Sequence, residues 1–110
     1  VIGNKNVEIE LLGGKEPSHL SPTDSRAFHA IEDICKRMNN DNLVAPYLVM
    51  GGTDAYRYEG ICENVYRYSP FTVNTSLLLT THGTNERIPV DCMENGVAFF
   101  KMYIRTLSAE

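Results

Sequence analysis

Apolar residues recur at helical spacing within residues 23–38. Members of this stripe lie three or four residues apart: Ala27, Phe28, Ile31, Ile34, Cys35 and Met38. Such spacing places them on one face of an amphipathic helix. Thr23, Asp24 and Ser25 are all suitable N-caps for this helix, and the Asn-rich residues 39–42 are typical of its end.

A second apolar stripe predicts a helix near the C-terminus. Its members are Met93, Val97, Phe100, Ile104 and Leu107. Pro89 suits the first turn of this helix, because the missing N–H and fixed φ of proline are tolerated there. Gly96 weakens the helix by up to about 1 kcal/mol relative to alanine, unless a close contact requires a residue without a side chain.

Three other segments carry the patterns of β-strands. Residues 6–11 alternate apolar and charged side chains, which predicts a half-exposed strand. Residues 43–50 are apolar without alternation, which fits a strand buried on both faces of a helix-covered sheet. Residues 62–68 are the third candidate, in which two tyrosines face one side and Arg67 faces the other.

The order of these elements predicts an α/β fold. Residues 53–59 fit a brief helix, and the threonine-rich residues 72–81 are mostly loop. From Thr23 onward, strands and helices alternate, which predicts a layered sheet covered by helices. The strand at residues 6–11 stands apart, because the proline-containing linker at 15–22 separates it from the rest.

Composition narrows the possible partners. A chain of 110 residues is one domain at most, and any apolar face that it cannot bury should seek a partner. The net charge of -4 argues against nucleic acid and anionic membranes as general partners. No apolar run approaches the roughly 20 residues that cross a bilayer. Cys35, Cys62 and Cys92 form no CxxC pair, so we expect buried thiols in a cytoplasmic protein.

Candidate chemistry begins at Gly51-Gly52-Thr53-Asp54, directly after the apolar run at 43–50. Ligands of open α/β sheets gather at the carboxyl ends of strands. Glycines there allow a ligand to approach the backbone, whose N–H groups can hold a carboxylate, and Thr53 adds a hydroxyl. The alternative is a tight turn in which Thr53 or Asp54 only caps the next helix.

His82 is the second candidate, in a loop between two threonines and Gly83. Histidine is the commonest neutral metal ligand, and Glu86 is near enough to support its other nitrogen. A single histidine does not make a zinc site, which needs three or four ligands, so a surface histidine stays an alternative. His19 and His29 are poorer candidates.

Two other patterns are weaker evidence of function. The runs Tyr56-Arg57-Tyr58 and Tyr66-Arg67-Tyr68 interleave arginine with aromatic residues, as in proteins that stack on nucleic-acid bases. The acidic total and the alternating strand pattern argue against that function. Cys92 paired with His82 would suit a thiol enzyme, but no cluster of basic residues surrounds Cys92 to activate it.

Three segments in order carry a family resemblance: residues 46–55 (PYLVMGGTDA), residues 64–70 (NVYRYSP) and residues 82–88 (HGTNERI). Together they resemble the C-terminal part of the co-catalytic zinc exopeptidase family that includes carboxypeptidase S, carboxypeptidase G and aminoacylase. Residues 8–25 resemble the chain leaving the inserted lid domain of that family and re-entering its catalytic domain. The resemblance covers essentially the whole chain.

The resemblance implies a domain organisation. Residues 1–14 would end the lid, or dimerisation, domain, and residues 15–22 would form the linker. Residues 23–110 would be the C-terminal part of the catalytic domain, so we expect a fragment of a homo-oligomeric metallopeptidase. The strand at 6–11 would then be left over from the lid.

The resemblance also implies residue roles. His82 matches the last metal ligand, Gly52 and Thr53 match the turn that contacts the carboxylate or acyl group of the substrate, and Asp54 and Glu86 match supporting positions. Members of the family hydrolyse peptide or N-acyl amino-acid amide bonds at a two-zinc site. The general base and the other metal ligands match no residue here, so we expect no catalytic residue and no activity in the isolated chain.

The substrate and the function each allow an alternative. Tyr56 stands where many carboxypeptidase S-like proteins have arginine, which leaves the substrate preference undecided. The alternative function is a non-catalytic α/β module for interaction or oligomerisation.

Overall fold

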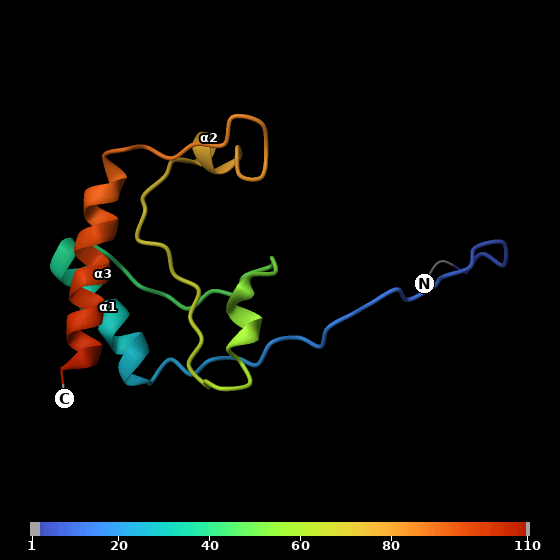
Figure 1. Ribbon diagram of the computed structural model, residues 1–110, viewed down its shortest axis with the longest axis horizontal. Coiled ribbons are helices and arrows are strands. Elements are labelled where there is room, and N and C mark those ends of the chain that lie inside the picture. Colours follow the sequence, from blue (N-terminus) through green and yellow to red (C-terminus); the bar gives the residue numbers. More distant parts are fainter. Residues whose placement is uncertain (1–2, 110) are drawn as a thin grey trace.

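The computed structural model describes residues 3–109, and within them it forms three α-helices and one 3₁₀ helix (Figure 1). These are α1 (Arg26–Met38), the 3₁₀ helix η1 (Asp54–Arg57), α2 (Thr75–Leu78) and α3 (Cys92–Ser108). The first two residues of the predicted lid segment and the last residue of the predicted catalytic segment lie outside the described residues.

The first predicted helix is confirmed by α1. Ser25 is its N-cap, and the side chain accepts a hydrogen bond from the N–H of Phe28 at 3.1 Å. Asn39 is the C-cap, and its backbone N–H bonds to the carbonyl of Cys35. The buried residues of α1 all come from the predicted stripe or its flank: Ala30, Ile31, Ile34 and Cys35. Helical periodicity therefore located this element within a few residues.

The core lies where α1 packs antiparallel against α3, side by side in Figure 1. Ile34 and Phe99 are its most buried side chains, at 1% and 2% exposed. Arg26 joins the start of α1 to the end of α3, since its Nη2 donates to the carbonyls of Thr106 and Ala109 at 3.0 and 2.9 Å. These carbonyls belong to the helix end, where no further turn supplies donors. The two helices form the stable centre of the molecule.

The predicted stripe of α3 is not the face that the structure buries. Met93, Val97, Phe100 and Ile104 are 42–63% exposed, whereas Cys92, Gly96 and Phe99 are buried. Phe99 is buried against Ile31, Ile34 and Cys35 of α1, and the ring of Phe71 fills the space that a side chain at Gly96 would occupy. The close contact that would justify a glycine in this helix is therefore present. The helix also begins at Cys92, so Pro89 precedes it and is not in its first turn.

The predicted layered α/β sheet is wrong, since no β-strand forms among residues 3–109. A strand is stable only beside a partner that completes its ladder of hydrogen bonds. The strand predicted at residues 43–50 has no such partner in the described part of the chain, and Leu43 and Met50 are 95% and 91% exposed. Residues 6–11, the predicted remnant of the lid, are likewise exposed and are not a strand.

Residues 62–68 keep the predicted alternation without joining a sheet. Tyr66 packs on Phe28 of α1 with ring centroids 5.6 Å apart, and Tyr68 packs on Phe99 of α3 at 4.8 Å. Arg67, between them, bonds instead to Thr53 and Glu59, which flank η1, and to Ser18 of the linker. The segment therefore has one face on the helices and the other toward η1.

The remaining segments extend away from this centre. Residues 53–59, predicted as a brief helix, contain η1, and residues 72–81, predicted as mostly loop, contain only the single turn of α2. The N-terminal segment runs outward from the body (Figure 1). The radius of gyration is 18.5 Å, against about 13 Å for a compact domain of this length. Much apolar surface is consequently left exposed, including parts of residues 7–12 and 43–50.

The contact between Gly96 and Phe71 can be tested by mutation. A Cβ at position 96 would lie 2.1 Å from Cε1 of Phe71, so we expect Gly96→Ala to lower the free energy of unfolding by about 1–3 kcal/mol. In a Phe71→Ala background the clash is absent, and the same change should raise it by up to about 1 kcal/mol through helix propensity. Urea unfolding followed by circular dichroism measures both values. A stabilising Gly96→Ala change in the otherwise unaltered chain would contradict this packing.

Candidate functional site

Thr53 organises the glycine turn that the sequence singled out. Its backbone is extended (φ −138°, ψ 167°), and its Oγ1 accepts the N–H of Ala55 at 3.3 Å, which makes it the N-cap of η1. A Cβ added at Gly51 or Gly52 would meet no atom within 4 Å, and both glycines are exposed. The turn therefore combines the predicted cap with backbone that is open to an approaching ligand.

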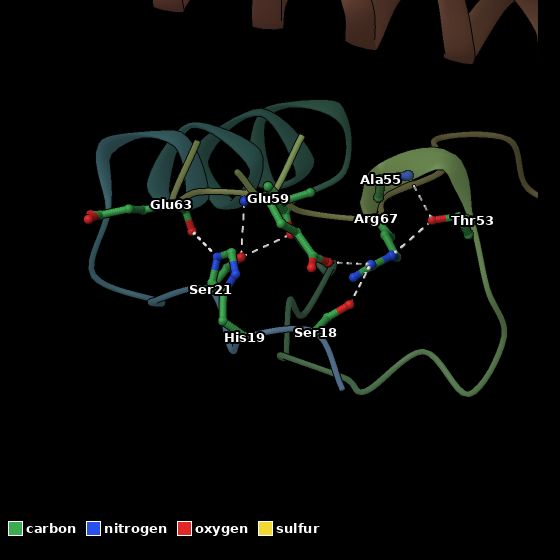
Figure 2. A network of polar contacts seen from close by, with 9 residues as sticks. Ser18, His19, Ser21, Thr53, Ala55, Glu59, Glu63 and Arg67 are labelled. Atoms are coloured by element: carbon green, nitrogen blue, oxygen red, sulfur yellow. Dashed lines mark hydrogen bonds and ion pairs between the residues drawn. The ribbon is translucent and has the colours of Figure 1, made fainter. Parts of the chain in front are cut away.

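Arg67 holds this turn from a distant part of the chain (Figure 2). Its Nε donates to Oγ1 of Thr53 at 3.0 Å, and its Nη2 donates to Oγ of Ser18 at 3.4 Å. The same Nη2 forms an ion pair with Glu59 at 3.3 Å, in which the two side chains are 25% and 21% exposed. The sequence pattern predicted that Arg67 faces away from Tyr66 and Tyr68, but it did not predict these partners.

The linker lies along residues 63–67 through side-chain contacts (Figure 2). Nε2 of His19 bonds to the carbonyl of Glu63 at 3.0 Å. Oγ of Ser21 accepts the N–H of Val65 and donates to the carbonyl of Val65, both at 3.0 Å. Side chains thus satisfy the backbone groups that a neighbouring strand would have bonded. His19, the poorer metal candidate, has this structural contact instead.

Glu86 fixes the backbone of the His82 loop. His82 adopts φ 62° and Asn85 φ 64°, left-handed conformations that are uncommon outside glycine. The carboxylate of Glu86 accepts the backbone N–H of His82 at 3.1 Å, which stabilises this turn. Glu86 therefore contacts the main chain of His82 rather than the imidazole. The His82 side chain is exposed on the loop.

The two predicted parts of the site are separate. No hydrogen bond or ion pair among the described residues joins the His82 loop to the Gly51–Thr53 turn, and the loop beside α2 lies apart from η1 in Figure 1. Within residues 3–109, no group of three His, Cys, Asp or Glu side chains could hold a metal ion. Asp54 pairs with Arg57 at 3.3 Å, but both are exposed, so this pair adds little stability. By itself, His82 could supply one ligand to a metal ion.

A hollow of about 410 Å³ lies beside the His82 loop. Apolar side chains that include Phe71, Leu77 and Ile88 line it, together with Glu86 and Arg87. Glu86 thus connects the loop backbone to the wall of this hollow.

Among the described residues, no helix is long and apolar enough to cross a membrane.

A second hollow, of about 280 Å³, opens between the helices and residues 62–68. Tyr66, Tyr68 and Tyr103 contribute to its wall. Partial burial raises the pKa of Tyr68 from 10.0 to about 12, helped by the hydrogen bond between its hydroxyl and Sγ of Cys35 at 3.1 Å. Burial also raises the pKa of Tyr103. The neutral phenols are therefore favoured in the folded chain.

Comparison with known proteins places the chain in a family. Residues 2–106 match peptidase family M20/M25/M40. The chain is 28% identical over 106 residues to a probable carboxypeptidase S-like 2 of Dictyostelium discoideum, covering 96% of this chain and 20% of that protein. It is 29% identical over 105 residues to the Xenopus tropicalis N-fatty-acyl-amino acid synthase/hydrolase PM20D1, with 94% and 20% covered.

Carboxypeptidase S of Saccharomyces cerevisiae is 30% identical over 107 residues, which cover 90% of this chain and 19% of that protein. The chain thus spans about one fifth of the length of the curated relatives that it matches. No solved structure matches it.

Tyr68 predicts how stability depends on alkaline pH. Because the pKa of Tyr68 is higher in the folded chain, its contribution is fully present below about pH 10 and is lost as the pH rises toward about 12. The free energy of unfolding should fall over this range, and less steeply in Tyr68→Phe, in which the Tyr103 contribution remains. Urea unfolding at a series of pH values measures the slope. Equal slopes for the two proteins would show that Tyr68 does not carry the effect.

Proposed function

The chain belongs to peptidase family M20/M25/M40, and we propose that it is part of a zinc-dependent hydrolase that cleaves peptide or N-acyl amino-acid amide bonds. The observation that carries the proposal is the family match over residues 2–106, with His82 exposed on a loop that Glu86 stabilises. The names of the relatives include a carboxypeptidase and an N-fatty-acyl-amino acid synthase/hydrolase. Both names describe chemistry at an amide bond.

His82 is the residue of this chain that we assign to the metal. A neutral imidazole is a common zinc ligand, and the exposed side chain leaves a nitrogen accessible. Glu86 supports it indirectly, by fixing the backbone turn from which the imidazole projects. Zinc, when bound, polarises the amide carbonyl and lowers the pKa of water. The described residues gather no group of three candidate ligands, and we propose that the other ligands of a two-zinc site come from elsewhere in the protein.

Gly52 and Thr53 are the residues that we assign to the substrate. The open backbone at Gly52 allows close approach, and the hydroxyl of Thr53 is held at the start of η1. We assign Asp54 a supporting position beside this turn, as the first residue of η1. We assign no general base to the described residues, so the chain alone should bind part of a substrate without hydrolysing it.

A second candidate function is an interaction or oligomerisation module. The exposed apolar residues favour it, because surfaces of this kind mark association sites. Leu43, Met50 and Ile104 are 95%, 91% and 63% exposed. In this proposal the protein is a homo-oligomer, and residues 1–14 belong to its dimerisation domain. The two functions are compatible if the module lies within a larger hydrolase.

Activity assays distinguish the two functions. We expect the 110-residue chain with added zinc to show no turnover of dipeptides or N-acyl amino acids, and the complete protein to hydrolyse at least one of them. His82→Ala should lower kcat/KM of the complete protein at least about 100-fold, because even loss of a group that only orients a ligand costs about 10–100-fold. His29→Ala, which removes an exposed histidine of α1, should leave it unchanged.

Turnover by the isolated chain that disappears in His82→Ala would contradict the expected inactivity. A complete protein that hydrolyses none of these compounds would contradict the hydrolase. Sedimentation of the chain at high concentration tests the module separately, since a monomer under these conditions would count against association.

A further inference from the structure

Arg67 joins three segments that are distant in sequence. Its partners Thr53, Glu59 and Ser18 lie 14, 8 and 49 residues away along the chain (Figure 2). The guanidinium is planar, and its donors have a fixed geometry, so each contact constrains the direction of the others. Thr53 is thereby fixed from outside its own helix.

The contacts of Thr53 determine what its hydroxyl can still do. A threonine hydroxyl has two acceptor lone pairs and one proton to donate. Oγ1 of Thr53 accepts the N–H of Ala55 at 3.3 Å and the Nε–H of Arg67 at 3.0 Å, so both acceptor sites are used. Its proton remains free for a further partner. That partner must be an acceptor, such as a carboxylate or amide carbonyl oxygen.

Glu59 compensates the charge of Arg67, so Arg67 can support the turn without itself attracting a negatively charged ligand. The ion pair at 3.3 Å balances the charge of the guanidinium, and both side chains are about three-quarters buried. Partial burial strengthens such a pair relative to one on the surface. Arg67 is thus held in place with its charge compensated, and the donor offered by the turn is the hydroxyl of Thr53.

Little else fixes the turn. Among the described residues, the bonds to Oγ1 of Thr53 are the hydrogen bonds in which residues 51–53 take part. No atom lies within 4 Å of the position that a Cβ would take at Gly51 or Gly52, so no packing contact holds these two residues. Loss of the Arg67 bond would leave only the local cap from Ala55, and would free one lone pair of the hydroxyl.

We infer that Arg67 is a positioning residue, which holds Thr53 so that its hydroxyl donates to an acceptor oxygen of the amide substrate. The inference rests on the proposed function, because that function supplies the substrate at Thr53. It adds to that function that Arg67 sets the direction of the Thr53 hydroxyl. It also adds that the substrate group bound there is a hydrogen-bond acceptor.

A double-mutant cycle in the complete protein tests the inference. The substrate is the dipeptide or N-acyl amino acid that the unaltered protein hydrolyses fastest. We expect Arg67→Met and Thr53→Val each to raise KM about tenfold, with kcat within about threefold, because each weakens one hydrogen bond of binding. The double variant should match Thr53→Val alone, since Arg67 acts through that hydroxyl.

Two further variants separate position from charge. Arg67→Lys keeps the charge but lacks the planar donors, so it should restore less than half of the lost affinity. Arg37→Met removes the same charge from the exposed surface of α1 and should leave KM unchanged. Effects of Arg67→Met and Thr53→Val that multiply in the double variant, or a KM that Arg67→Met leaves unaltered, would overturn the inference.

The geometry can be measured without activity. In the ¹H–¹⁵N spectrum of the 110-residue chain, Arg67→Met should shift the amide signals of Gly52 and Thr53, and Arg37→Met should not. Unshifted signals would overturn the inference whatever the activity. Shifted signals in a protein that hydrolyses none of the substrates would overturn the substrate role together with the proposed function, and would leave the contact between Arg67 and Thr53 standing.

Discussion

The packing of α1 against α3 is the contact on which the rest of the structure depends. Ile34 and Phe99 are almost fully buried between the helices, and the tyrosines of residues 62–68 pack on the same centre. Because side chains alternate in an extended segment, seating both tyrosines on the helices turns Arg67 the other way. Arg67 then reaches Thr53, so the core helps to position the Gly51–Thr53 turn.

Local sequence patterns predicted the elements that local interactions determine. The limits of α1 follow from its apolar periodicity and from the cap at Ser25, both of which involve residues within one helix. The predicted sheet failed because strand pairing depends on partners far along the chain, and residues 43–50 find none among the described residues. The buried face of α3 could not be predicted, because it depends on partners distant along the chain, namely α1 and the ring of Phe71.

The candidate site divides in the same way. Thr53 and His82 could be identified from the turn and loop that surround them, and the cap at Thr53 is present as one of the two predicted alternatives. The role of Arg67 depends on contacts up to 49 residues away, and the only sequence signal was an arginine between two aromatic residues. The metal role of His82 remains a prediction, since it needs ligands from outside the described residues.

The central claim is that the His82 loop contributes one ligand to a zinc site completed elsewhere in the protein. A crystal structure of the complete protein with zinc, located by anomalous scattering, tests this claim most directly. We predict a zinc ion at about 2.0–2.1 Å from a ring nitrogen of His82, with its other ligands from outside residues 3–109. If the zinc ions of the active protein are bound without His82 as a ligand, the account is contradicted.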